Sequence, residues 1–271
     1  MHITSRQNPR LKEAARLREH RARERSGQIL IDGGREIRRA LAAGVRPLAA
    51  FVCEELATGD DARASVVELR HSAPGFFTLT PSVYEKLAYG ERNDGVVLVA
   101  EMPRRSLANL KLPQQPLIAI IEGVEKPGNL GAILRSADGA GVDAVILADP
   151  RTDLFNPNTI RASLGTVFRD NVCSAPVAEV IAWLRELRIP MYATRPDAKQ
   201  LYTEVDLSRG AAIVLGSEAT GLSELWNSGE ISPIRLPMHG IADSLNVSVT
   251  AAVLFYEALR QSGGRETADK R

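Results

Sequence analysis

The stretch Leu117-Ile-Ala-Ile-Ile-Glu-Gly-Val-Glu-Lys-Pro-Gly-Asn-Leu-Gly-Ala-Ile-Leu-Arg135 is the most informative part of the sequence for architecture. It begins with an unbroken apolar run, turns through glycine and proline, and continues with helical spacing. Unbroken apolar runs recur at 144–148 and 211–215. Strands that are apolar at every position are covered on both faces, which is typical of a parallel sheet between layers of helices. The sequence therefore predicts an α/β domain with a parallel sheet.

The length of 271 residues suits two modest domains. Upstream of Leu117, short β-rich runs alternate with helical stretches and predict a smaller α/β module, followed by a proline-rich linker. Strands are expected at 28–32, 48–53, 76–79 and 96–100, and helices near 35–43, 60–71, 81–89, 129–140, 157–164, 177–188 and 245–261. The predicted boundaries are 1–102 for the N-terminal domain, 103–116 for the linker, 117–262 for the second domain and 263–271 for a disordered tail.

Composition excludes several classes of protein. With 44% hydrophobic and 25% charged residues, the chain is neither disordered nor collagenous. It has no apolar run near the roughly 20 residues that cross a bilayer. The first 25 residues carry eight arginines and lysines and lack an apolar signal core, so we expect a cytoplasmic protein without a membrane partner. Cys53 and Cys173 are expected to be buried and reduced, and no metal site is expected.

Basic residues gather at the N-terminus. The net charge is only +1, but residues 1–46 contain twelve basic and five acidic residues. Residues 8–25 predict one narrow amphipathic helix with a wide cationic face. Arginine forms bidentate bonds with phosphate, so the face suits a nucleic-acid backbone. A solvated surface helix explains the same charge pattern equally well.

The turn after the first buried strand excludes two common nucleotide sites. Gly123 and Gly128 have the spacing of a P-loop, but Asn129 and Leu130 stand where lysine and serine or threonine are needed. The glycine pattern of dinucleotide-binding folds is also missing. The following helix instead places Gly128, Gly131, Arg135 and Gly139 on one face. This face is either a groove around a functional arginine or a site of close helix packing with a solvated arginine.

Two further segments are informative. One follows the buried strand expected at 211–215, and the other leads into the last helix. Gly216-Ser-Glu-Ala-Thr-Gly221 has glycines that can turn backbone amides toward a ligand. The stretch 237–248 contains a loop in which Asp243 or Ser244 is expected to cap the last helix, with Asn246 and Ser248 in its first turn. Each segment alone could be a plain turn. In open α/β sheets, however, ligands collect beyond the carboxyl ends of the strands.

Taken together and in this order, the three segments resemble the SpoU family of RNA ribose 2'-O-methyltransferases within the SPOUT superfamily. The resemblance covers about residues 117–261, and it rests on the following patterns: Asn129-x-Gly131-x-x-x-Arg135-x-Ala137, Gly216-x-Glu218-x-x-Gly221 and Ser244-Leu-Asn-Val-Ser248. The N-terminal module is similar to the family's RNA substrate-binding domain through Ser5-x-x-Asn8-Pro9-x-x-Lys12.

The resemblance implies a parallel α/β fold with a deep trefoil knot, which binds S-adenosylmethionine and packs against a second knot in a homodimer. The final helix, with Leu245, Val249, Val253 and Tyr256, suits that contact. The residues implied to bind the cofactor are Thr194, Gly216, Ser217, Ile234, Leu236, Met238, Ser244 and Leu245. Arg135 is implied to be the central catalytic residue, and the residues implied to position it and the loops are Asn129, Glu218, Ser244 and Asn246. We expect Arg135 and the two later segments to converge on one cavity.

A guanidinium stays protonated at neutral pH and is a poor base. Our hypothesis is therefore that Arg135 clamps the phosphate beside the target ribose and stabilises the developing alkoxide. The residues expected to contact RNA are Arg6, Arg10, Lys12, Arg16, Lys126 and Arg161. Many family members have Asp where this chain has Lys126, so substrate identity does not carry over from them. The pattern Arg161-x-Ser163-x-Gly165 suits either an RNA contact or a packed helix end.

The substrate implied by the resemblance is ribosomal RNA, because a separate N-terminal module is more typical of rRNA-modifying members. An enzyme that protects the ribosome from an antibiotic is a special case of this reading. A tRNA 2'-O-methyltransferase is one alternative. The other is a catalytically silent RNA-binding or ribosome-assembly protein that retains the knot. The presence of Asn129, Arg135, Glu218 and Asn246 together argues against a silent protein.

Overall fold

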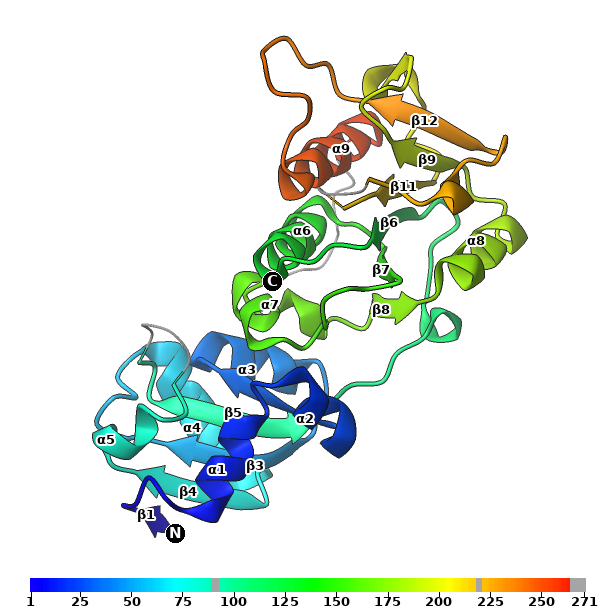
Figure 1. Cartoon of the computed structure of the whole chain (residues 1–271). Helices are drawn as coiled ribbons and strands as arrows, with labels where there is room; N and C mark the ends of the chain where they lie inside the picture. Colours follow the sequence, from blue (N-terminus) through cyan, green and yellow to red (C-terminus); the bar gives the residue numbers. More distant parts are fainter. Residues whose placement is uncertain (89–92, 218–220, 264–271) are drawn as a thin grey trace. The chain divides into compact units, whose positions relative to one another are not determined.

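A computed structural model describes residues 1–88, 93–217 and 221–263. The chain divides into two compact units. The first contains Met1–Pro103 and Asp153–Arg169, and the second contains Arg104–Thr152 and Asp170–Arg271. Most helices and strands of the two units are labelled in Figure 1.

The first unit is built on a mixed sheet with the strand order β1-β4-β3-β5-β2. Its strands are β1 (His2–Ile3), β2 (Gln28–Asp32), β3 (Pro47–Val52), β4 (Gly75–Leu79) and β5 (Val96–Glu101). β4 is parallel to β1 and β3, whereas β5 is antiparallel to β3 and β2. The four strands expected from the sequence are present. The two-residue β1 is too short to leave an alternating pattern.

The helices of the first unit are α1 (Pro9–Arg16), α2 (His20–Ser26), α3 (Gly34–Ala42), α4 (Asp60–Ser72), α5 (Pro81–Tyr84) and α7 (Pro157–Ala162). The prediction of one continuous helix over residues 8–25 is wrong, because α1 ends at Arg16 and α2 starts at His20. The fully buried Arg23 explains the break. Its Nη1 donates to the carbonyl oxygens of Leu17 at 2.7 Å and Arg18 at 2.8 Å, which lie beyond the end of α1.

The segment Asp153–Arg169 packs within the first unit, although the boundaries predicted from sequence place it in 117–262. Asp153 forms an ion pair with Arg23, at 2.6 Å from Nε and 2.5 Å from Nη2. Further along, Arg39 Nη1 donates to the carbonyl oxygen of Leu164 at 2.6 Å. The chain therefore enters the first unit a second time, and a buried ion pair holds it there.

The second unit is built on a parallel sheet with the order β10-β12-β9-β11-β6-β7-β8. Its strands are β6 (Leu117–Glu122), β7 (Ala144–Ala148), β8 (Val172–Ala175), β9 (Met191–Thr194), β10 (Gln200–Leu201), β11 (Ala211–Leu215) and β12 (Ile231–Arg235). Every recorded strand pair in it is parallel. The three apolar runs form β6, β7 and β11, which are buried along their whole lengths. The predicted parallel α/β class is thereby confirmed.

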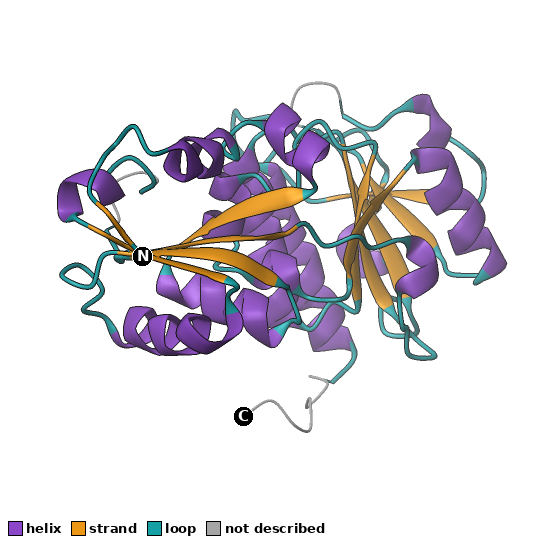
Figure 2. Ribbon diagram, turned by 90° about the horizontal axis from the view of Figure 1, so that it is seen from below, coloured by secondary structure: helices purple, strands orange, loops and turns teal. Residues whose placement is uncertain are grey.

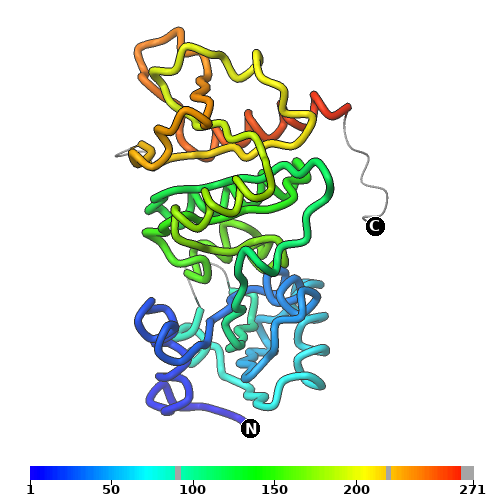
Figure 3. The backbone as a smooth tube through the Cα atoms, turned by 90° about the vertical axis from the view of Figure 1, so that its right-hand side faces the viewer, coloured from blue at the N-terminus to red at the C-terminus, as the bar shows by residue number. Residues whose placement is uncertain are grey.

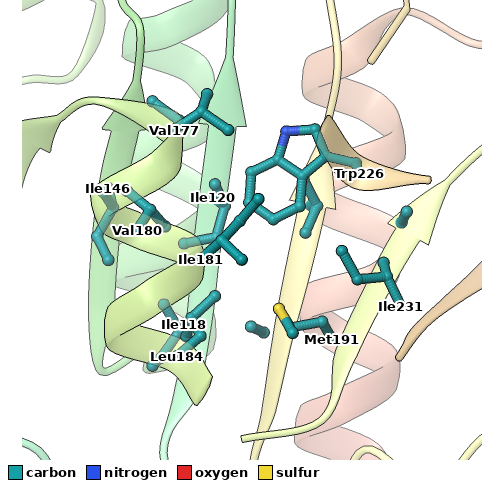
Figure 4. Packing of buried hydrophobic residues seen from close by; sticks show 14 of the residues in the cluster. Ile118, Ile120, Ile146, Val177, Val180, Ile181, Leu184, Met191, Trp226 and Ile231 are labelled. Atoms are coloured by element: carbon teal, nitrogen blue, oxygen red, sulfur yellow. The ribbon is translucent and has the colours of Figure 1, made fainter. Parts of the chain in front are cut away.

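Helices cover both faces of this sheet. α6 (Pro127–Ala140) and α9 (Val247–Gln261) lie on one face, and α8 (Val177–Glu186) lies on the other (Figure 1). Figure 2 shows the strands of each unit flanked by helices. On the α8 face, Val180, Ile181 and Leu184 pack against the strands, with Trp226 and Met191 closing the cluster (Figure 4).

Both cysteines are buried and free, as predicted. None of the helices in the described ranges is long and apolar enough to cross a membrane. The predicted tail at 263–271 lies, apart from Gly263, outside the described residues. Over the same described part of the chain, no three His, Cys, Asp or Glu side chains come together as metal ligands would. The expectation of no metal stays a prediction.

Candidate active site

A pocket lies beyond the carboxyl ends of β9, β11 and β12, and it encloses a cavity of about 240 Å³. It brings together all eight residues that the resemblance assigns to the cofactor: Thr194, Gly216, Ser217, Ile234, Leu236, Met238, Ser244 and Leu245. The remaining lining residues are Arg195, Pro196, Leu215, Gly221, Arg235, Asp243, Val247 and Thr250. That these residues bind a cofactor stays a prediction, but they do surround one space.

The loop after β11 closes on itself at the edge of this pocket. The backbone N–H of Ser217 donates to the Gly221 carbonyl at 3.2 Å, and the Gly221 N–H donates back to Ser217 at 3.0 Å. A Cβ on Gly216 would lie 2.6 Å from the carbonyl carbon of Gly221, and Gly221 has a φ of +67°. The tight closure therefore explains both glycines of the pattern. Glu218, which lies between them, is outside the described residues.

Glu122 connects the first segment to the chain just after the second segment. This residue ends β6 and is only 7% exposed, and its Oε2 accepts a hydrogen bond from the backbone N–H of Ser223 at 2.8 Å. A buried carboxylate needs such a donor to offset its desolvation. Sequence reasoning did not select Glu122. The available signal was a charged residue at the end of an otherwise apolar strand.

Asn246 connects the third segment to the first. α9 begins at Val247, so Asn246 is its N-cap, and the expectation that Asp243 or Ser244 is the cap is wrong. Asn246 Oδ1 accepts from the backbone N–H of Ser248 at 2.9 Å and from its Oγ at 2.6 Å. Asn246 Nδ2 donates to Asn129 Oδ1 at 3.3 Å. The first and third sequence patterns therefore meet at this side-chain contact.

Arg135 is exposed on α6 and is not among the residues that line the pocket. No hydrogen bond or ion pair joins it to another described residue. The expected convergence of Arg135 and the two loops on one cavity is therefore not seen within a single chain. α6 and α9 run in the same direction, and a Cβ on Gly139 would lie 3.0 Å from the Tyr256 hydroxyl. Close helix packing thus accounts for Gly139, while the guanidinium remains available to a ligand or partner.

The predicted RNA-contacting residues of the N-terminal arm differ in their surroundings. Arg6 donates to the Ser82 carbonyl at 2.6 Å and pairs with Glu85 at 2.5 Å. Arg10 lies over the Phe77 ring at 4.9 Å from its centroid. The side chains of Lys12 and Arg16 are exposed on α1. The arm is therefore partly structural, while Lys12 and Arg16 remain exposed cations on α1.

Lys126 and Arg161 lie at helix ends, Lys126 exposed at the N-cap of α6 and Arg161 in the last turn of α7. In the pattern that begins at Arg161, Ser163 is fully buried and its Oγ donates to the Ile160 carbonyl at 2.9 Å. Gly165 has a φ of +83°, and a Cβ there would lie 3.2 Å from Arg39 Cβ. Packing therefore explains Ser163 and Gly165. The role of Arg161 in RNA binding stays a prediction.

A parallel sheet with such a pocket beyond its strand ends is typical of enzymes that bind nucleotide-like cofactors. Residues 116–256 match the model of the SpoU rRNA Methylase family, and residues 8–98 match the MRM3-like substrate binding domain. The chain therefore belongs to the SpoU rRNA methylase family.

Named relatives agree with this membership. The chain is 30% identical to a 23S rRNA (uridine(2479)-2'-O)-methyltransferase of Streptomyces viridochromogenes, over 98% of this chain and 94% of the relative. It is 27% identical to the 23S rRNA (guanosine(2553)-2'-O)-methyltransferase RlmP of Bacillus subtilis, covering 94% and 97%. With the 23S rRNA (guanosine-2'-O-)-methyltransferase RlmB of Bordetella pertussis it shares 39% identity, covering 66% and 75%.

Solved structures are similar over nearly the whole chain. A crystal structure of an RNA 2'-O ribose methyltransferase is 42% identical, with a TM-score of 0.84 and coverage of 96% of this chain and 99% of that one. The SpoU methyltransferase AviRb from Streptomyces viridochromogenes in complex with AdoMet is 27% identical, with a TM-score of 0.85 and coverage of 94% and 98%.

Proposed function

We propose that this protein transfers a methyl group from S-adenosylmethionine to the 2'-hydroxyl of a ribose in ribosomal RNA. The observation that carries the proposal is the pocket, which is formed by all eight residues expected at the cofactor. The family match and the rRNA-modifying relatives support the same activity and substrate class. The match of residues 8–98 to a substrate-binding domain supports RNA recognition by the first unit.

The residues of the pocket fit an S-adenosyl cofactor. Apolar side chains of Ile234, Leu236, Met238 and Leu245 offer a surface for a purine, and the turn at Gly216 brings backbone groups to the same wall. A buried guanidinium nitrogen of Arg195 also lies at this pocket, and it has no hydrogen-bond partner among the described residues. When bound, the cofactor supplies a methyl group on a sulfonium, which an in-line nucleophile can accept.

Arg135 has the role of electrostatic stabilisation rather than of base. Its guanidinium holds a phosphate next to the target ribose and stabilises negative charge on the 2'-oxygen, while the proton leaves to that phosphate or to water. The Asn246–Asn129 contact joins the first and third segments, and Glu122 ties the first segment to Ser223, two residues after the second. Glu218 is assigned a positioning role from the family resemblance.

We further propose a homodimer in which the exposed face of α9 is the contact. Val249 and Tyr256 on α9 are 47% and 52% exposed, and Leu245, just before the helix, is 39% exposed. Apolar side chains of this size at helical spacing suit burial against a second copy. In such a dimer, Arg135 of one protomer serves the pocket of its partner, which accounts for its absence from the lining of its own pocket.

A trefoil knot is part of the same proposal. β11 lies between β6 and β9, while β12 lies on the far side of β9, so the chain returns across the sheet to reach α9 (Figure 3). α9 then packs beside α6 and against β11. This return path supports threading of the C-terminal segment. We also propose a cytoplasmic location, where ribosomal RNA is accessible.

The proposal is tested by incubating purified protein with S-adenosylmethionine labelled on the methyl group and with ribosomal or transfer RNA. Label in ribosomal RNA is expected. Label confined to tRNA would show that the substrate is transfer RNA instead of ribosomal RNA. Saturable RNA binding without label in either RNA would show a silent binding protein and overturn the proposal.

A further inference from the structure

Arg195 stands out among the residues of the pocket because of an unsatisfied guanidinium nitrogen. It follows Thr194 at the end of β9, and its backbone N–H donates to the Ile234 carbonyl at 2.9 Å, which holds the residue at the pocket wall. Its Nη2 is buried, yet it has no hydrogen-bond partner in the described chain. Buried polar atoms are nearly always paired, so an unpaired one indicates a missing partner.

The missing partner is not an acidic side chain of the described chain. No ion pair joins Arg195 to any described carboxylate, including Asp243, the acidic residue of the pocket lining. Leaving a guanidinium nitrogen desolvated and unpaired is unfavourable, because it loses its hydrogen bonds to water without replacement. An anionic acceptor that enters with a ligand would remove this penalty. The planar fork of arginine matches a carboxylate in a bidentate manner.

We propose that Arg195 binds the carboxylate of the methionyl group of the S-adenosyl cofactor. This inference rests on the proposed function, because it assigns one end of the cofactor within the same pocket. The carboxylate is the single anionic group of that molecule, and Arg195 offers the charge and geometry to receive it. The apolar residues Ile234 and Met238 are then left for the purine end.

The assignment is tested by comparing two ligands that differ in the aminoacyl part. S-adenosylhomocysteine carries the carboxylate, whereas 5'-methylthioadenosine keeps the nucleoside and lacks it. Calorimetric titration of Arg195→Gln should show a loss of affinity for S-adenosylhomocysteine of about 10- to 100-fold. The affinity for 5'-methylthioadenosine should stay that of the unaltered protein. Arg195→Lys keeps the positive charge but not the planar guanidinium, so it should lose less affinity for S-adenosylhomocysteine than Arg195→Gln.

Arg209→Gln is a matched control, because Arg209 is exposed and lies outside the pocket lining. Equal losses for both ligands in Arg195→Gln would mean that Arg195 only shapes the pocket, and would overturn the assignment. An unchanged affinity for both, with weaker RNA binding, would assign Arg195 to an RNA phosphate instead. The assignment would also be contradicted if Arg235→Gln, and not Arg195→Gln, lost affinity for S-adenosylhomocysteine alone. If the unaltered protein bound neither ligand, the proposed function itself would fail.

Discussion

Three arginines of this protein show how surroundings decide what one residue type does. Arg23 is fully buried and joined to Asp153, so it serves the fold. Arg195 lies at the pocket with a nitrogen that no described residue pairs, and Arg135 is exposed on a glycine-rich helix face. Sequence patterns identified Arg135 through its spacing from Asn129. They did not separate Arg23 from the exposed cations of the arm, because burial depends on Asp153, which lies far away in the sequence.

Replacing Arg135 with alanine should lower the methyl-transfer rate by about 100- to 1000-fold, since it removes the group that stabilises the developing negative charge. Binding of S-adenosylhomocysteine should be unchanged, because Arg135 is not part of the pocket lining. Single-turnover transfer and calorimetry measure the two effects. The exposed Arg209→Ala is the control, and near-normal transfer by Arg135→Ala would remove Arg135 from the mechanism.

At the scale of elements, the strands β6, β7 and β11 were predictable because each is buried on both faces. β12 was not, since its central Ser232 and Pro233 are exposed and interrupt any apolar run. The cap of α9 was misplaced by two to three residues, because Asp243, Ser244 and Asn246 all suit a cap and only the start of the helix distinguishes them. The eight residues expected to bind the cofactor were predicted from the family resemblance and not from hydrophobic periodicity.

The capping bonds of Asn246 and its bond to Asn129 can be separated by substitution. Asn246→Ala should lower the free energy of unfolding by about 1 kcal/mol, because it removes the N-cap of α9. Asn246→Ser should keep most of this stability, but its side chain is too short to reach Asn129. We therefore expect both variants to lose methyl transfer, with only alanine losing stability in urea unfolding. Full activity of Asn246→Ser would show that the contact with Asn129 is dispensable.

The loop at Gly216 should not accept a side chain. A Cβ in Gly216→Ala would collide with the backbone of Gly221, and the pocket edge would have to shift. We expect S-adenosylhomocysteine binding to be lost in calorimetry, while the far-ultraviolet circular dichroism spectrum remains that of the folded protein. Gly229→Ala is a suitable control, because a Cβ there meets no atom of the described residues within 4 Å. Normal binding by Gly216→Ala would contradict this view of the loop.

At the scale of the whole molecule, the two units are linked by more than a single connection. The chain leaves the second unit after Thr152, contributes Asp153–Arg169 to the first unit and then returns. This arrangement was hidden from sequence reasoning, since the apolar pattern of 157–164 suits a helix of either unit. The partner of Asp153 lies 130 positions earlier.

The buried pair predicts a large loss of stability in the first unit. Asp153→Ala leaves the Arg23 guanidinium buried without its carboxylate and should lower the free energy of unfolding by about 3–5 kcal/mol. The double variant, Arg23→Met with Asp153→Ala, should lose less free energy of unfolding than the sum of the losses in the two single variants. Denaturant unfolding measures both. Strict additivity would mean that the ion pair does not couple these residues.

The proposed dimer makes its own prediction. Val249→Glu should place a charge in the contact and shift the protein toward monomer in sedimentation equilibrium, with loss of transfer because Arg135 no longer reaches the partner's pocket. Val67→Glu on α4, at a position that is 61% exposed, is the matched control and should leave the assembly unchanged. Active monomers of Val249→Glu would refute the shared site.

The decisive measurement is alkaline hydrolysis of ribosomal RNA that the purified protein has labelled with methyl-tritiated S-adenosylmethionine. Methylation of a 2'-oxygen protects the adjacent phosphodiester bond, so we predict that the label remains in a dinucleotide resistant to alkali. Arg135→Ala should produce about 100- to 1000-fold less of it in the same time. Label released in mononucleotides would place the methyl group on a base and contradict ribose methylation at this site.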